Sequence, residues 1–396
     1  MNRRFINARV ACPATGVREG ELAVAGETIV ARVPDDAMVI DCGGKVLAPG
    51  IVDLGAFAVD KAACRAGGIV RVGLMPDQSP VLDDPGIVRR AATMGKPELW
   101  VHPLGAATKG LNGTDLAEMA INAGAGARAV ATGRGWIADS GVMAKVLAYA
   151  RDCGLTLVTH AEDGGLATGA VATDGLTATL LGLASAPPVA EALAVARDLM
   201  LAETLGARIH IRQVTTAAAL DMIRAVKRRG VGVTCGITPA HLMLSDIAMS
   251  DFRTFAHLSP PLRGEDDRQA CVAAVADGTI DVIASGHDPR GAEDKRLPFA
   301  DSAPGAAGAA TLLACALTLG LPLDRLFALL AANPARVLGL DAGTLEPGRP
   351  ADLILFDPGS PWQIDATLHG NTPFDGLPVQ GRVLRMFKGG NEIAAV

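Results

Sequence analysis

The chain has 396 residues, 49% of them hydrophobic, and a formal net charge of −6. This length suffices for one large domain and a small one, and a mildly acidic chain without a basic block gives no reason to expect nucleic acid as a partner. No uncharged apolar run reaches the ~18 residues of a membrane span, and the start, MNRRFINARVACPATG, lacks the long apolar segment of a secretory signal. We therefore expect a cytoplasmic protein without membrane attachment.

The seven cysteines are scattered along the chain and include no C-x-x-C pair. An odd, dispersed set of this kind is typical of free thiols in a reducing compartment. Neither a disulfide framework nor a thiolate zinc site is expected.

Short apolar runs rich in Val and Ile recur through the middle of the chain, separated by segments with helical periodicity. The runs lie at residues 51–54, 67–75, 98–104, 126–132, 155–160, 207–214, 230–237 and 280–285. The helical segments include TDLAEMAINAGA, SGVMAKVLAYARDCG, VAEALAVARDLMLAETLG and TAAALDMIRAVKRRG, the last with a Thr cap near residue 216 and an end at Gly230. Apolar strands that alternate with helices predict a parallel sheet buried on both faces, and eight of them predict an α/β fold, the (β/α)8 TIM barrel.

The two ends of the chain differ from this middle part. Residues 1–48 and 343–396 contain short alternating runs and turns, which predict a small composite β-sandwich domain built from both termini, with the barrel at 49–342. Only some dozen residues separate the first two barrel strands, close to the minimum of about 10–12 for a crossover with its helix. We expect the first helix to be stunted or missing.

In such a barrel, functional side chains follow the carboxyl ends of the strands. These positions hold Gly55 and Phe57 after the first strand, Thr132, Gly133 and Arg134 after the fourth, His160, Glu162 and Asp163 after the fifth, Gln213 after the sixth, Thr238 and His241 after the seventh, and Gly286, His287 and Asp288 after the eighth. Gly55 and Phe57 can neither bind a metal nor move a proton, so the residues after the first strand supply no catalytic or metal-binding side chain.

Motifs along almost the whole chain carry a resemblance to a known family. They are MPDQSPVLDDP (75–85), PLGAATKGLNG, DSGVMAKVLAYA, THAED, AVARDLMLAETLGARIHI, TPAHL, SPPLRGEDDRQA, DGTIDVIASGHDP, NPARVLGL, GTLEPGRPADLILFDP and NTPFDG. In their order and spacing they resemble the dihydroorotases of the amidohydrolase superfamily. The resemblance implies a metal-dependent hydrolase barrel with a composite β domain.

The same resemblance implies that most of the metal site is degenerate. Where the family has His-x-His after the first strand, this chain has Gly55 and Phe57, and the following segment with its substrate-binding arginine is largely deleted. The carboxylate after the fourth strand is replaced within residues 132–134, the histidine after the sixth strand is Gln213, and the aspartate that serves as metal ligand and general base is Gly286.

Two substrate-contacting asparagines of the family correspond to Asp77 and Ser259, and His160 alone retains a ligand of the family. A catalytic zinc needs about three protein ligands and an open position for water, whose pKa it lowers from ~16 to ~7. Loss of the base removes a further contribution of roughly 10²–10⁴ in rate. We therefore expect no catalytic or substrate-binding residues, no metal and no zinc cofactor.

Plain structural interpretations remain open for the polar residues of this region. His160 is a relict ligand or a hydrogen-bonded core histidine, His287 is a relict, and His241 packs or hydrogen-bonds locally. A new acidic site could combine the two relict histidines with Glu162, Asp163 and Asp288. The Lys109–Gly110 turn could bind a phosphate. The simplest interpretation of the charged patches RAVKRR and RGEDDRQ is that they are solvated helix faces.

Three function hypotheses follow. The chain resembles the non-catalytic dihydroorotase-like proteins that associate with aspartate carbamoyltransferase, which implies an inactive structural partner of that enzyme in a hetero-oligomer and in pyrimidine biosynthesis. The first alternative is an active dihydroorotase, or another cyclic amidohydrolase, with a rearranged metal site built on His160, His287, Glu162 and Asp288. The second is a regulator that binds a pyrimidine intermediate in the vacated pocket.

Overall fold

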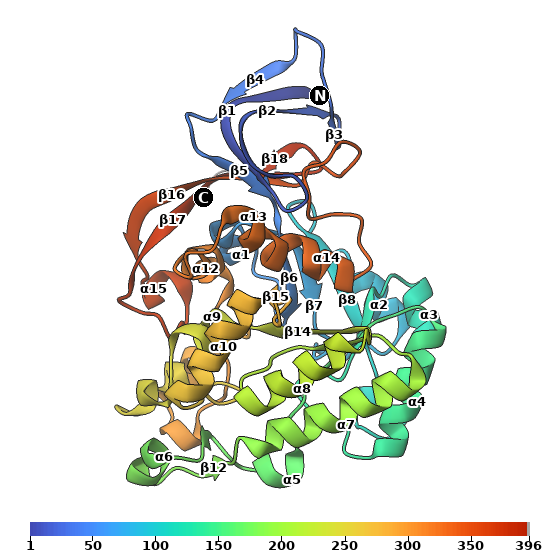
Figure 1. The fold of residues 1–396 in the computed structure, drawn as a ribbon, viewed down its shortest axis with the longest axis vertical. Helices are drawn as coiled ribbons and strands as arrows, with labels where there is room; N and C mark the ends of the chain where they lie inside the picture. The colour runs from blue at the N-terminus through green and yellow to red at the C-terminus, as the bar shows by residue number, and fades with distance from the viewer. Residues whose placement is uncertain (394–396) are drawn as a thin grey trace.

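The computed structural model describes residues 1–393, which form a barrel with a second sheet at one end of the molecule (Figure 1). The barrel strands are parallel and follow the chain order around the sheet. They are β6 (Ile51–Ala56), β7 (Ile69–Leu74), β8 (Trp100–Ala106), β9 (Ala129–Ala131), β10 (Leu157–Thr159), β13 (Ile209–Ile211), β14 (Val233–Ile237) and β15 (Val282–Ile283). Each lies within or across one of the eight predicted runs, so the (β/α)8 prediction is confirmed.

The first and last strands of this sheet meet through the residues that follow them. Phe57 N–H donates to the carbonyl of His287 over 2.8 Å. Asp53 in β6 accepts hydrogen bonds from Ser285 N at 2.8 Å and from Ser285 Oγ at 2.5 Å. The barrel is thereby nearly closed, and the loops after β6 and β15 lie against each other.

The strands are apolar because both of their faces are covered. All six residues of β6 and all six of β7 are buried, as expected for a parallel sheet between two layers. One face packs into a cluster that joins Val52, Leu104, Val158 and Val282 with Ala335 of a C-terminal helix.

Helices cover the outside of the barrel (Figure 1). The principal ones are α1 (Lys61–Gly67), α2 (Pro85–Ala91), α3 (Met119–Gly124), α4 (Ser140–Asp152), α7 (Val189–Leu205), α8 (Ala217–Arg228) and α10 (Glu265–Asp277). Shorter ones are α5 (Gly164–Ala167), α6 (Leu176–Leu181), α9 (Pro239–Met243), α11 (Ala292–Arg296), α12 (Leu312–Leu317), α13 (Leu323–Phe327), α14 (Asn333–Val337) and α15 (Ala366–His369). Strands β11 (Ala172–Thr173) and β12 (Ser185–Ala186) pair with each other beside α5 and α6.

Local sequence signals account for several helix ends. The first helix is stunted, as predicted: α1 has seven residues between the Asp60 cap and Gly68, whose φ of 74° ends it. Thr216 accepts from Ala219 N over 3.4 Å and caps α8, which ends at Arg228, two residues before Gly230. The helix predicted over 114–125 shrinks to α3, because the preceding residues form a bridge between Thr108 and Leu116.

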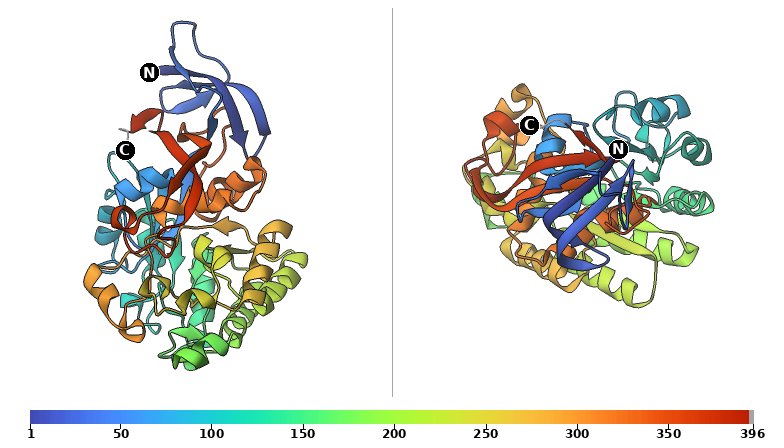
Figure 2. Two further views of the ribbon diagram at one scale, coloured as in Figure 1. Left: turned by 90° about the vertical axis from the view of Figure 1, so that its left-hand side faces the viewer. Right: turned by 90° about the horizontal axis from the view of Figure 1, so that it is seen from above.

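Both ends of the chain contribute strands to the second sheet, which carries its own apolar core. Its strands are β1 (Asn2–Cys12), β2 (Gly16–Ala25), β3 (Thr28–Val30), β4 (Met38–Asp41), β5 (Val46–Pro49), β16 (Leu353–Gln363), β17 (Pro378–Lys388) and β18 (Asn391–Ile393). Strand β16 pairs with β5, and the rings of Phe5 and Phe387 meet edge to face at 5.0 Å. Figure 2 shows the N-terminal strands in blue beside the C-terminal strands in red. No helix among residues 1–393 has the length and hydropathy of a membrane span.

Candidate functional site

A cavity of about 160 Å³ lies where the barrel strands end. Its walls are formed by residues that follow strands β6, β9, β13, β14 and β15, together with two loop segments. They are Phe57, Arg134, Arg212, Gln213, Thr238, Ala240, His241, Leu258, Ser259, Ser285, Gly286, Asp288, Arg290, Pro304, Gly305 and Ala306. The structure therefore gathers most of the predicted degenerate positions at one place.

Glycines stand at two of these positions, and neighbouring side chains take up the space beside them. Gly55 has φ +98°, and a Cβ there would lie 3.3 Å from Arg212 Cδ. Gly286 has φ +60°, and a Cβ there would lie 2.7 Å from Thr238 Cγ2. Both backbones occupy the left-handed region that favours glycine, and neither site has open room for a larger residue.

Arg212, which the sequence analysis did not single out, reaches across the interior from the end of β13. Only 5% of the residue is exposed, and its Nη2 lies 3.4 Å from His160 Nδ1. Burial lowers the pKa of Arg212 to about 10, although Asp77 and Asp288 partly counter this effect. The side chain of Arg212 thus contacts both Gly55 and His160, two positions to which the resemblance assigns metal ligands of the family.

Two guanidinium groups lie near the ring of Phe57. The Arg134 Cζ is 4.1 Å and the Arg212 Cζ is 5.0 Å from the centre of its ring. Cations at these distances from an aromatic face are attracted by its quadrupole. The ring of Phe57 therefore helps to hold two arginines at the mouth of the barrel.

Arg134 and Asp288 form a two-armed ion pair, which Arg290 and Asp77 extend. Arg134 Nε and Nη2 donate to the two Asp288 oxygens over 3.0 and 2.7 Å, and Arg290 Nη2 donates to Asp288 Oδ2 over 2.8 Å. Asp77 Oδ1 accepts from Arg134 N over 2.9 Å. Burial alone would lower the pKa of Arg134, but the hydrogen bond and the charge of Asp288 raise it above its ordinary value.

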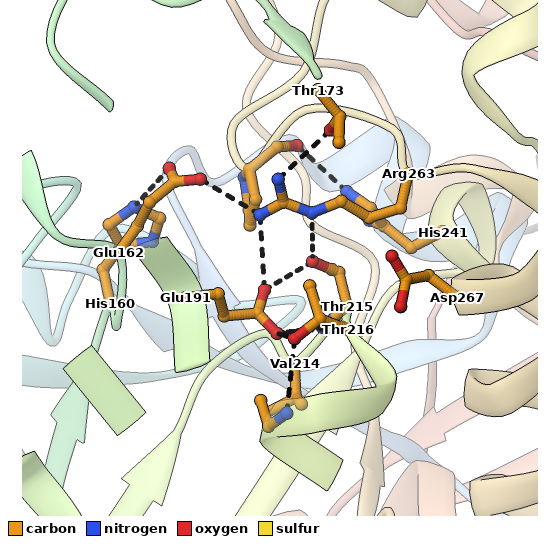
Figure 3. Close-up of polar contacts among 12 residues, drawn as sticks. His160, Glu162, Thr173, Glu191, Val214, Thr215, Thr216, His241, Arg263 and Asp267 are labelled. Carbon is orange, nitrogen blue, oxygen red and sulfur yellow. Dashed lines mark hydrogen bonds and ion pairs between the residues drawn. The ribbon is translucent and has the colours of Figure 1, made fainter. Parts of the chain in front are cut away.

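A buried polar network continues from His160 into the protein (Figure 3). His160 Nε2 lies 3.6 Å from Glu162 Oε2, and Arg263 Nη2 donates to Glu162 Oε1 over 3.0 Å. Burial raises the pKa of Glu162, yet the hydrogen bonds and charges of His160 and Arg263 outweigh it and lower that pKa to about 2. Glu162 therefore stays ionised and engaged.

Glu191 forms the other side of this network (Figure 3). Its Oε1 accepts from Thr215 N, Thr216 N and Thr216 Oγ1 over 2.8, 2.9 and 2.8 Å, and its Oε2 lies 3.5 Å from Arg263 Nη2. Arg263 is 3% exposed, so the prediction that the RGEDDRQ patch is a solvated face is wrong for this residue. The buried partner Glu191 supplies the physical reason.

The remaining predicted residues have local roles in the described structure. His287 is buried, which lowers its pKa, and its Nδ1 faces Ala309 N at 3.3 Å. His241 Nδ1 lies 2.7 Å from Thr238 Oγ1 and its Nε2 lies 3.0 Å from the Pro260 carbonyl, which agrees with local hydrogen bonding.

Two further candidates are occupied by neighbouring groups. Asp163 caps α5 by accepting from Gly165 N and Leu166 N, so it does not join Glu162 and Asp288 in a new acidic site. In the Lys109–Gly110 turn, Gly110 N donates to Asp83 Oδ2 over 2.7 Å, so a carboxylate already stands where a phosphate was considered. Ser259 lines the cavity.

This donor set does not fit the family's metal. Within residues 1–393, no three His, Cys, Asp or Glu side chains converge as a metal site would require. His160 faces a guanidinium on one ring nitrogen and a carboxylate on the other, and Asp288 is committed to two arginines. Zinc sites need about three such donors aimed at one point.

Comparisons with known proteins agree with this fold. Residues 114–393 match the model of the Amidohydrolase family. The chain is 37% identical to the dihydroorotase of Syntrophotalea carbinolica, covering 96% of this chain and 95% of that protein. It is 38% identical to the dihydroorotase of Anaeromyxobacter dehalogenans, with coverage of 96% and 95%.

Among solved structures, the L-hydantoinase (dihydropyrimidinase) from Arthrobacter aurescens superposes with a TM-score of 0.87 at 24% identity, over 99% of this chain and 96% of that one. This likeness establishes the fold. The family match and the sequence relatives show that the chain belongs to the amidohydrolase family and, within it, to the dihydroorotases and their relatives.

Proposed function

We propose that this chain is a catalytically inactive dihydroorotase-like protein that serves as a structural partner of aspartate carbamoyltransferase. The observation that carries the proposal is the content of the barrel mouth. Gly55, Phe57, Gln213 and Gly286 stand where the family has metal ligands, and the guanidinium of Arg212 lies among them.

The chemistry of the family reaction argues for inactivity. Ring opening in a dihydroorotase needs a metal to bring the pKa of water near 7 and a base to move protons. Here the position of the base is Gly286, which has no side chain, and the buried cation Arg212 repels a second cation near His160. Among the described residues, the carboxylate on the cavity wall is that of Asp288, and it is paired with Arg134 and Arg290.

The assembly role rests on the resemblance to non-catalytic relatives and on what this chain retains. A scaffold needs a stable barrel and an intact outer surface, and it does not need metal ligands. Arginine pairs and apolar packing now stabilise the barrel mouth, where substrate would bind in an active relative. A chain that has lost catalytic groups but has kept its fold is expected to be maintained for the contacts that its surface makes with a partner.

Co-expression with aspartate carbamoyltransferase from the same source tests the assembly role. Size-exclusion chromatography with light scattering should give one complex of fixed stoichiometry, larger than either protein alone. The transferase expressed alone should be smaller or less active, and adding this chain should restore it. Two proteins that elute separately, with transferase activity indifferent to this chain, would contradict the proposal.

A further inference from the structure

Arg212 is a buried cation without an anionic partner at close range. No carboxylate oxygen of residues 1–393 lies within 4.0 Å of its guanidinium nitrogens, whereas Arg134, Arg263 and Arg290 all have such a partner. Its hydrogen bond to His160 is long, at 3.4 Å, and its Nε has no partner among the described residues. Buried charges are normally paired, because desolvation of an isolated ion is costly.

The carboxylates nearest to the cavity are already taken. Asp288 is shared by Arg134 and Arg290, and Asp77 lies 3.6 Å from Arg134 Nη1. These two arginines and two aspartates balance in charge. Among these charged residues Arg212 therefore leaves one positive charge in excess, which favours a singly charged anion over a doubly charged one. Glu162 lies on the far side of His160, at its other ring nitrogen, and pairs with Arg263.

The cavity offers a second unmet hydrogen-bonding group beside this cation. Gln213 also lines it, and the Gln213 Oε1 is buried without a partner among the described residues. Buried acceptors are rarely left without a donor. The other walls include apolar groups from Leu258, Ala240 and Ala306, so an ion that is polar on all sides would be poorly matched.

We propose that this cavity binds a small organic carboxylate that also carries a hydrogen-bond donor, with its carboxylate on Arg212 and its donor on Gln213. A cavity of about 160 Å³ suits such a compact molecule. Carboxylates are the anions that guanidinium groups bind with good geometry. The site goes beyond the proposed assembly role and does not depend on it, because no contact with another protein is involved.

Thermal unfolding in simple salts tests this site. The probes are sodium glycolate, which has a carboxylate and a hydroxyl group, sodium acetate, which lacks the hydroxyl, and sodium phosphate, all matched to sodium chloride in ionic strength and pH. Glycolate at tenfold its dissociation constant should raise the Tm by about 1–2 °C. Acetate should bind more weakly, and phosphate should give no shift that depends on Arg212.

Four variants locate the effect. Arg212→Met should lose the response to glycolate and acetate. Arg212→Lys keeps the charge and should show a reduced response, and it replaces the Met variant if that variant fails to fold. Gln213→Leu should make the responses to glycolate and acetate equal. Arg229→Met, at an exposed arginine paired with Glu203, should respond as the original chain does.

Several results would overturn the site. They are a Tm in glycolate equal to that in chloride, an undiminished response in folded Arg212→Met, or an Arg212-dependent shift in phosphate as large as in glycolate. None of these results bears on complex formation with the transferase, so this inference and the proposed function fail separately.

Discussion

Arg134 and Asp288 connect the loops that follow the fourth and eighth barrel strands through two hydrogen bonds of 3.0 and 2.7 Å. The resemblance to dihydroorotases implies that these two loops contribute to a metal site in active members of the family. Here an ion pair joins them, with Phe57 stacked on the guanidinium at 4.1 Å. The mouth of the barrel is therefore held by residues of the chain itself.

Removal of Arg134 should destabilise the protein. We expect Arg134→Ala to lower the free energy of unfolding by about 1–3 kcal/mol, because Asp288 loses a bidentate partner but keeps Arg290, and because the Arg134 side chain is 37% exposed. Urea unfolding measures the difference. Arg296→Ala is the control: its pair with Glu293 is 73% and 86% exposed, and its loss should cost about 0.5 kcal/mol or less. Equal effects would contradict a structural role for Arg134.

Phe57 should stabilise the fold through its aromatic ring and not through its volume alone. Phe57→Leu keeps an apolar side chain but removes the aromatic face next to Arg134 and Arg212. A cost of about 1–3 kcal/mol is expected from lost cation–π attraction and packing. In Arg134→Ala the same substitution should cost measurably less. An unchanged cost in the double-mutant cycle would show that the stacking contributes nothing.

Because Glu162 is ionised in the folded chain, the free energy of unfolding should depend on pH. Its pKa in the folded chain is about 2, below the ordinary value of 4.5. It therefore stabilises the fold fully above about pH 4.5, and this contribution disappears as the pH falls towards 2. Glu162→Gln should be less stable by about 3 kcal/mol at pH 7, with a difference that shrinks below pH 4.5.

Chemical denaturation across this pH range checks the prediction, with Glu265→Gln as the control. Glu265 pairs with Arg268 on the surface of α10, where solvent screens the interaction, so its substitution should matter far less. A pH-independent difference for Glu162→Gln would mean that the carboxylate is not held by charge.

Gly286, the position that the resemblance assigns to the family aspartate, should not accept a larger side chain. A Cβ at Gly286 would lie 2.7 Å from Thr238 Cγ2, whereas one at Gly16, which has a comparable φ of +81°, would meet nothing within 4 Å. Gly286→Ala should therefore cost about 1–3 kcal/mol more than Gly16→Ala. Adding Thr238→Ser, which deletes the obstructing methyl group and keeps the hydroxyl that faces His241, should recover much of the loss. If Thr238→Ser did not restore stability to Gly286→Ala, the contact with the Thr238 methyl group would not be the cause of the loss.

The barrel could be predicted from sequence because buried parallel strands are continuous apolar runs, as β6 and β7 show. The shortened first helix followed from the small number of residues between these strands. Boundaries were less accurate: the 126–132 run contains the three-residue strand β9. The turn at 108–116 displaced the start of α3, because the bridge between Thr108 and Leu116 overrode the helical periodicity of these residues.

The sequence predicted which metal-binding side chains the site lacks, but not which arginines occupy it. Gly55, Phe57, Gln213 and Gly286 were identified as degenerate from the family resemblance, and the structure places three of them on the cavity wall. The sequence signal that points to Arg212 is a charged residue inside the apolar run IHIRQV. Arg263 lies in a charged run typical of a surface, and its buried partner Glu191 is 72 positions away in the chain, so the local sequence does not reveal its burial.

Metal content measured together with turnover tests the central claim most directly. Protein purified without chelator, incubated with zinc and then desalted, should hold far less than one zinc per chain and should neither open dihydroorotate nor close carbamoyl aspartate above the buffer rate. Stoichiometric, tightly held zinc accompanied by either reaction would contradict inactivity and would favour a rearranged site around His160, His287, Glu162 and Asp288.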